Sequence, residues 1–229
     1  MTNIHNNHIE PNTKLFELID AHPSVVSIFS RLNITLPFGD ISIAEMCERD
    51  GHNVELFIVL CRMHIDATYR PDKEVLSATM ISEVVGYLRA SHRYYAQYML
   101  PHVARHLDEI LSHCDTLSKR VLSSFYQEYT RYVMSHFEDE ESNIFAPIER
   151  AEQSCVRDLA SLEHPHGDID DRTNDIASLI IKSLPEVVPT PLRCAMLDDI
   201  YALRDDLRTH SNIEMFLLRP IVDSTLKSK

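Results

Sequence analysis

The chain has 229 residues, of which 44% are hydrophobic and 25% are charged, enough for one large domain or two small ones with a buried core. Its four glycines are too few for an all-β protein rich in tight turns or for a glycine-rich phosphate loop, and its net charge of −13 disfavours non-specific nucleic-acid binding. Five irregularly spaced cysteines do not form a disulfide framework. No apolar run reaches the roughly 18 residues of a membrane span, and the polar N-terminus lacks a signal-peptide core. We therefore expect a soluble, cytoplasmic protein.

The first third of the chain contains short apolar segments separated by prolines and glycines. They predict small helices near 14–21, 24–32, 41–50 and 53–64. We therefore expect a small N-terminal helical domain over residues 1–66 and a polar linker over 67–74. Residues 42–51 have the cadence of a helix-turn-helix, but 1–66 hold four basic and nine acidic residues, whereas a DNA-reading domain needs a basic face.

Residues 75–229 contain four longer apolar stripes whose members recur at three- and four-residue steps, as in the helices of a bundle. The stripes run from Val85 to Val103, from Leu122 to Pro147, from Leu159 to Ile180 and from Met196 to Ile221. Met99 and Pro147 are placed on the inward stripes, and Pro101 predicts a bend in the first helix. The fold class is therefore all-α, with the N-terminal domain followed by an up-down-up-down four-helix bundle.

One histidine interrupts each stripe, namely His92, His136, His166 and His210. The midpoints between consecutive histidines fall at positions 114, 151 and 188, where polar or proline-containing segments predict turns. Residues equally far from a turn lie at the same level of an antiparallel bundle, so the four imidazoles can meet in one layer. Because residues four apart share a helix face, Glu140 and Glu214 add a carboxylate each, one turn after His136 and His210.

Four imidazoles and two carboxylates at one level favour a pair of transition-metal ions, and this mixed nitrogen and oxygen set fits iron or manganese better than a thiolate-rich zinc site. A carboxylate has two oxygens and can span two metals, so Glu140 and Glu214 are interpreted as bridges. Their neighbours Glu138, Asp139 and Glu141 are interpreted as a solvated acidic face, or at most as side chains around the ligands or along a path by which iron enters. Taken singly, each histidine could instead be an ordinary core residue in a metal-free bundle.

Other histidines of the bundle are interpreted as bystanders. His106 lies 14 residues after His92, about 21 Å along a helix, and so cannot share its layer. His102 and His113 fail for the same reason. His164 is rotated about 200° from His166, so only one of these two can face inward.

The strings HFEDEESNIF at 136–145, EHPHGD at 163–168 and HSNIE at 210–214 make the bundle resemble the hemerythrin-like HHE domain. Together with the N-terminal block, the layout resembles the repair-of-iron-centres proteins. The resemblance implies two non-haem iron ions in an oxo- and carboxylate-bridged centre. The implied ligands are the same six residues: His92, His136, Glu140, His166, His210 and Glu214.

The N-terminal block departs from that family, whose members carry adjacent cysteines there; this chain reads TLPFGD at 35–40 instead. Cys47 and Cys61 lie on expected helices and are interpreted as small apolar core residues. Any repair step that needs those thiols is therefore not expected to proceed in the usual way.

The resemblance implies a role in the nitrosative and oxidative stress response, in which the protein repairs iron–sulfur clusters by donating iron, by reducing nitric oxide, or both. Its partners would then be damaged iron–sulfur proteins and a diatomic ligand, NO or O₂, with neither nucleic acid nor membrane involved. The alternative is a di-iron sensor of O₂ or NO that signals to a protein partner through the N-terminal block. Reversible oxygen transport is disfavoured, because no fifth histidine lies at a suitable level. The sequence leaves open the catalytic residues, the reductant, whether the protein is an enzyme, and the oligomeric state, a homodimer included.

Overall fold

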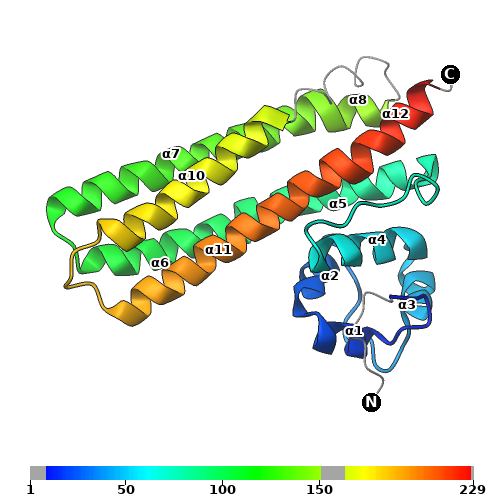
Figure 1. The fold of residues 1–229 in the computed structure, drawn as a ribbon, viewed down its shortest axis with the longest axis horizontal. Coiled ribbons are helices and arrows are strands. Elements are labelled where there is room, and N and C mark those ends of the chain that lie inside the picture. The colour runs from blue at the N-terminus through cyan, green and yellow to red at the C-terminus, as the bar shows by residue number, and fades with distance from the viewer. Residues whose placement is uncertain (1–8, 151–162, 228–229) are drawn as a thin grey trace. The chain divides into compact units, whose positions relative to one another are not determined.

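The computed structural model describes residues 9–150 and 163–227, without the side chains of 163–166 and 226–227, and it confirms the all-α class (Figure 1). Two compact units are present: a bundle unit of residues 92–211, and a terminal unit that joins the chain up to Ser91 with residues from Asn212 onward. The division falls within two unbroken helical runs. None of the described helices is long and apolar enough to cross a membrane.

The terminal unit contains the small helices expected near the N-terminus. They are α1 (Leu15–Ala21), α2 (Val26–Leu32) with a preceding 3₁₀ turn at Pro23–Val25, α3 (Ile43–Asp50) and α4 (Val54–Ile65). A capping box starts α3: the Ser42 side chain accepts from the Glu45 backbone N–H, and the Glu45 carboxylate accepts from the Ser42 N–H. Gly51 ends α3 with a φ of 79°, a left-handed conformation that glycine adopts without strain.

Polar contacts link these small helices to the first half of α5 (Ile81–Tyr94). The hydroxyl of the buried Tyr87 lies 2.7 Å from His64 Nε2 and accepts a hydrogen bond from Arg31 at 3.3 Å. His52 Nδ1 lies 2.9 Å from a carboxylate oxygen of Glu83. Hydrogen bonds that are wholly or partly buried therefore link the small helices of the terminal unit to α5.

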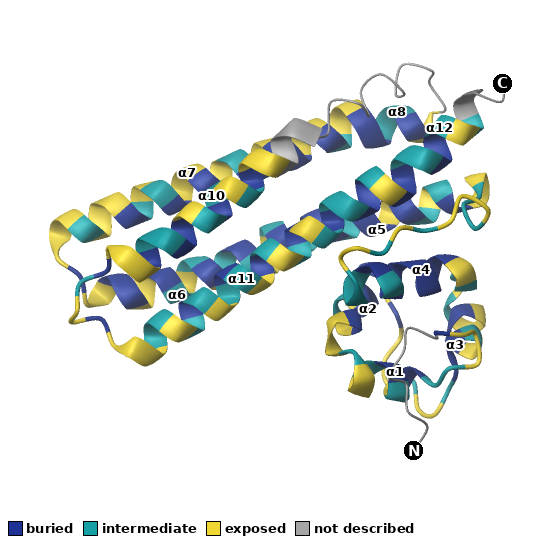
Figure 2. Cartoon of the chain, in the orientation of Figure 1, coloured by how far each residue is buried: buried dark blue, intermediate teal, exposed yellow. Residues whose placement is uncertain are grey.

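Long helices form the bundle unit and pack side by side. They are α6 (Leu100–Ser112), α7 (Thr116–Glu140), α10 (Glu163–Lys182) and α11 (Thr190–Ile213), with the short α8 (Ala146–Glu149) after α7. Short turns at 113–115 and 183–189 join α6 to α7 and α10 to α11, and α10 packs on α7 (Figure 1). These turns contain the predicted midpoints 114 and 188, whereas 151 lies outside the described residues. Buried residues recur along the facing sides of the helices (Figure 2).

Within residues 9–150 and 163–227, three π-helical segments lie inside the continuous helical runs, and each ends just before a residue that precedes proline. They are η3 (Tyr95–Met99) before Leu100–Pro101, η4 (Glu141–Phe145) before Ala146–Pro147, and η6 (Glu214–Leu218) before Arg219–Pro220, where α12 (Arg219–Lys227) begins. Proline has no N–H for the normal bond to the fourth carbonyl back and its ring crowds that carbonyl. The preceding residue reaches the fifth carbonyl back instead, as the N–H of Leu100 does to Tyr95.

The wider turns shift the inward stripes by one residue. Met99 and Pro147, which the sequence placed on the stripes, are only partly buried, and Leu100 and Ile148 occupy the buried positions. The bend expected at Pro101 thus takes the form of a π-helical turn. An ideal α-helical period does not include this extra residue, which is why the sequence pattern missed it.

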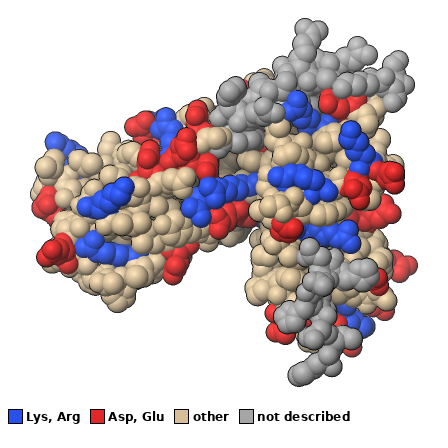
Figure 3. Space-filling model, in the orientation of Figure 1, with Lys and Arg blue, Asp and Glu red and all other residues tan. Residues whose placement is uncertain are grey.

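On the face drawn in Figure 3, Lys and Arg side chains are interspersed with Asp and Glu among uncharged residues, so neither sign dominates.

Two cysteines of the terminal unit lie in its core. Cys47 and Cys61 have no exposed surface, which confirms their interpretation as core residues. Burial raises the pKa of Cys47 to about 12, with the carboxylates of Glu83 and Asp50 adding to the shift. Burial also raises the pKa of Cys61 well above its usual range. Both thiols therefore stay protonated near neutral pH and are poor nucleophiles.

Thiol labelling tests this protection. At pH 8 a thiol with a pKa near 12 is ionised in roughly one molecule in 10⁴, so native Cys47 and Cys61 should stay unlabelled by a maleimide while the exposed Cys194 reacts. Peptide mass spectrometry assigns the labelled positions, and protein unfolded in denaturant should label at all three. Labelling of native Cys47 as fast as Cys194 would contradict the buried, protonated state.

Candidate metal centre

Four buried side chains bring metal-ligating atoms together where the long helical runs meet. His92, Glu140, His210 and Glu214 each offer one ligand atom, and these atoms all lie within 4.8 Å of one another. The exposed fractions of these residues are 5%, 0%, 3% and 0%, respectively. His92 lies in the last turn of α5, Glu140 ends α7, and Glu214 follows His210 by four residues on one unbroken helical run.

The distances between these side chains match those of ligands around a common ion. The Nε2 atoms of His92 and His210 are 3.1 Å apart. Two nitrogens that each lie about 2.0–2.1 Å from one metal, at tetrahedral or octahedral angles, are separated by about 3 Å. The two imidazoles therefore lie at a spacing that a shared metal allows, which is also the length of a hydrogen bond between them.

Glu140 directs its two carboxylate oxygens toward different histidines. Its Oε2 lies 3.2 Å from Nε2 of His92, and its Oε1 lies 3.0 Å from Nε2 of His136. His136 is itself buried and lies one turn earlier on α7. The carboxylate thus spans the space between two imidazoles on different helices.

The chemistry of the donors fits a metal cation. Burying a carboxylate without compensating charge costs several kcal/mol, and here two carboxylates lie together with no exposed surface. Imidazole nitrogen and carboxylate oxygen together suit divalent iron, manganese or zinc. A cation of this class at the centre of the cluster would offset the desolvation of Glu140 and Glu214.

Aromatic rings enclose the histidines, a feature that the sequence reasoning did not identify. Phe137 stacks on His92 with ring centroids 4.2 Å apart, and Phe145 stacks on it from 5.5 Å. Tyr95 packs edge-on against His210 at 5.8 Å, and its hydroxyl donates to the backbone carbonyl of Asp206. These contacts fix the imidazole orientations and limit the access of water.

Glu141 contacts the outer nitrogen of His92. Its Oε1 lies 3.1 Å from His92 Nδ1, and the carboxylate is 35% exposed. A carboxylate on the outer nitrogen fixes which imidazole nitrogen faces the metal and raises its basicity. Glu141 therefore orients the His92 ligand, as the sequence allowed for a side chain around the ligands, and is more than part of a solvated acidic face. An α-helical wheel turns it about 100° from Glu140, so the spacing alone could not assign this contact.

The structure thus places the six predicted ligands in three ways. It brings His92, Glu140, His210 and Glu214 together. It places His136 beside them through Glu140. His166 belongs to α10, but its side chain lies outside the described part of the chain. His102 and His106, interpreted as bystanders, lie apart from this centre in a second cluster with Asp199.

A cavity of about 290 Å³ lies beside the centre. His92 and Phe137 form part of its lining, together with the acidic Glu138 and Glu141. It is large enough for small molecules or a hydrated ion to approach His92 from outside.

Comparison with known protein families identifies one that matches most of the chain. The Hemerythrin HHE cation binding domain matches residues 83–222, which is more than half of the chain and spans all six predicted ligands. No curated protein matches the chain.

The contact between Glu141 and His92 can be tested by substitution. Glu141→Ala should weaken metal binding about 10- to 100-fold, because His92 loses the partner that orients it. Competition with a chelator of known affinity measures the change. The matched control is Glu138→Ala, two helix positions before Glu140 and exposed. Equal affinities for the two variants would contradict an orienting role for Glu141.

Proposed function

Because the chain belongs to the hemerythrin HHE cation-binding family, we propose that its buried cluster holds two non-haem iron ions bridged by Glu140 and Glu214. The observation that carries the proposal is the Glu140 carboxylate, whose two oxygens face imidazoles of two different helices. A bridging carboxylate has this arrangement, since each oxygen can serve one metal. The proposed terminal ligands are His92, His136, His166 and His210.

We propose further that the protein acts in the nitrosative and oxidative stress response, as the repair-of-iron-centres proteins do, by restoring damaged iron–sulfur clusters. When bound, an iron pair supplies a position for a diatomic molecule and shares the electron changes of its reduction. The chain's own residues orient the imidazoles, through Phe137 and Glu141, and restrict the access of water. The cavity beside His92 gives NO or a departing iron ion a way past Glu138 and Glu141.

A sensor of O₂ or NO is the second candidate, and the buried thiols favour it. Cys47 and Cys61 are protonated core residues, so the terminal unit offers no reactive thiol there for a repair reaction. In this candidate the ligand-bound centre reports to a protein partner without turnover. The two candidates share the same metal centre and differ in the step that comes after ligand binding.

Iron loading tests the centre itself. Anaerobically loaded wild-type protein should hold two irons per chain in a coupled pair, and Glu140→Ala should keep at most one weakly held iron, because a bridge is lost. Elemental analysis and Mössbauer spectroscopy measure both outcomes. Glu138→Ala serves as the control and should keep the pair. A fully occupied, antiferromagnetically coupled pair in Glu140→Ala would disprove the bridging role.

Recovery of a damaged enzyme tests the function. An iron–sulfur hydratase inactivated by nitric oxide should regain activity with the iron-loaded protein and a reductant, but not with His210→Ala, which lacks a ligand for the pair. The same amount of free Fe²⁺ controls for unassisted transfer. Tight NO binding with neither NO consumption nor recovery of the hydratase would instead support the sensor.

A further inference from the structure

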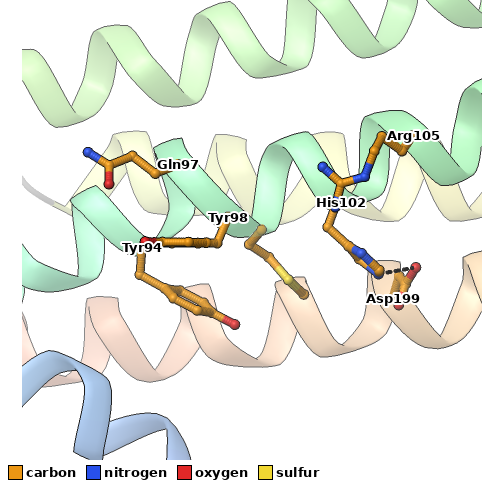
Figure 4. A pocket seen from close by; sticks show the side chains of 7 residues that line it. Tyr94, Gln97, Tyr98, His102, Arg105 and Asp199 are labelled. Carbon is orange, nitrogen blue, oxygen red and sulfur yellow. Dashed lines mark ion pairs between the residues drawn. The ribbon is translucent and has the colours of Figure 1, made fainter.

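A second group of metal-ligating side chains lies between α6 and α11, within the bundle unit. Figure 4 shows two of its members, His102 and Asp199. His102 and His106 are four residues apart on α6, and Asp199 lies on α11. Both imidazoles meet the same carboxylate oxygen. Asp199 Oδ2 is 3.1 Å from His102 Nε2 and 2.5 Å from His106 Nδ1.

We propose that His102, His106 and Asp199 form a second site, which binds one divalent transition-metal ion of the iron and zinc class. One ligand atom from each of the three lies within 4.8 Å of the other two. Two histidines at this helical spacing on one face are a recurrent zinc-binding arrangement. Two imidazoles with one carboxylate also form the three-ligand set of many Fe²⁺ and catalytic Zn²⁺ sites, in which the remaining positions take water or another small ligand.

The surroundings of the cluster leave those remaining positions accessible. The side chains of His102, His106 and Asp199 are 49%, 22% and 22% exposed, so an ion can reach them from solvent without opening of the bundle. His102 and Asp199 line a cavity of about 390 Å³ together with Tyr94, Tyr98 and Arg105 (Figure 4). The cavity has room for water or a small anion on the metal, and Arg105 supplies a positive charge that favours the anion.

This site is separate from the buried centre. His102 follows His92 by ten residues on the same helical run, which places it about 15 Å along the axis. One ion therefore cannot bind both groups. The inference does not depend on the proposed repair function or on the identity of the metal in the buried centre.

The competing explanation is a metal-free clamp, in which both histidines donate hydrogen bonds to Asp199 and hold α6 against α11. A clamp and a metal site respond differently to two substitutions. His106→Ala removes a ligand and a donor together. Asp199→Asn keeps an acceptor oxygen for the histidines but removes the negative charge that a cation needs.

Zinc titration of the full-length protein, with iron already loaded in the buried centre, tests the proposal. Calorimetry of the wild type should show one additional zinc per chain. His106→Ala and Asp199→Asn should each bind this zinc about 100-fold more weakly or worse, because even residues that only support a ligand contribute about 10- to 100-fold to metal affinity. Iron content and Mössbauer spectra should stay unchanged in every sample, which shows that zinc has not displaced iron. His113→Ala, an exposed histidine at the end of α6, is the matched control and should bind zinc like the wild type.

Thermal unfolding distinguishes the clamp. For a metal site, zinc raises the Tm of the wild type and of His113→Ala but not that of Asp199→Asn, because only a bound ligand shifts the folding equilibrium. The proposal is overturned if the wild type takes up no additional zinc at about 100 µM free zinc, because the dissociation constant would then be well above about 100 µM. It is also overturned if Asp199→Asn and the wild type bind zinc equally.

Discussion

The burial of two glutamate side chains in the bundle is the constraint on which the centre depends. Glu140 and Glu214 have no exposed surface, and a buried carboxylate is stable only where cations or hydrogen-bond donors surround it. The imidazoles of His92 and His136 are turned toward Glu140, which brings donor atoms rather than apolar groups to the carboxylate. The buried carboxylates therefore need positive charge or hydrogen-bond donors around them, and binding of a cation, as in the family, would supply that charge.

Pro101, Pro147 and Pro220 introduce π-helical turns into the helices that carry the buried centre. The π-helical turns begin directly after Glu140, at Glu214, and three residues after His92. Each extra residue changes which side chains face inward after it. Phe145, at the end of η4, reaches His92 in this way and stacks on it. Local backbone chemistry thus contributes to the aromatic enclosure as well as to the bend of the helices.

The sequence predicted the helices and part of the buried centre because both depend on repeated spacings. Apolar periodicity located the small helices to within a residue or two, and equal distances from the turns selected His92 and His210, whose Nε2 atoms are 3.1 Å apart. The register beyond each π-helical turn was not predictable from an ideal helical period. The contact between Glu141 and His92 depends on the approach of η4 to α5, which no spacing within one helix encodes.

The position of Asp199 in the second cluster was likewise not predictable from spacing within one helix. His102 and His106 carry a readable signal, their four-residue spacing, but their partner lies 93 residues beyond His106 on another helix. An aspartate on a partly exposed helix face has no distinguishing pattern in the sequence. Only the packing of α6 on α11 brings it to the imidazoles. Sequence reasoning could therefore exclude these histidines from the buried centre but could not find where they converge.

The two clusters differ in the physical property that controls an ion's residence. At the buried centre, stacked rings and the Glu141 contact hold the imidazole of His92, so an ion can leave only when ligands or helices move. At the cluster of His102, His106 and Asp199 the side chains are 49%, 22% and 22% exposed, so water can reach an ion there without movement of the helices. The same helical run thus contributes histidines to one buried cluster and to one partly exposed cluster. If both bind metal as proposed, the difference in burial favours retention at the first and faster exchange at the second.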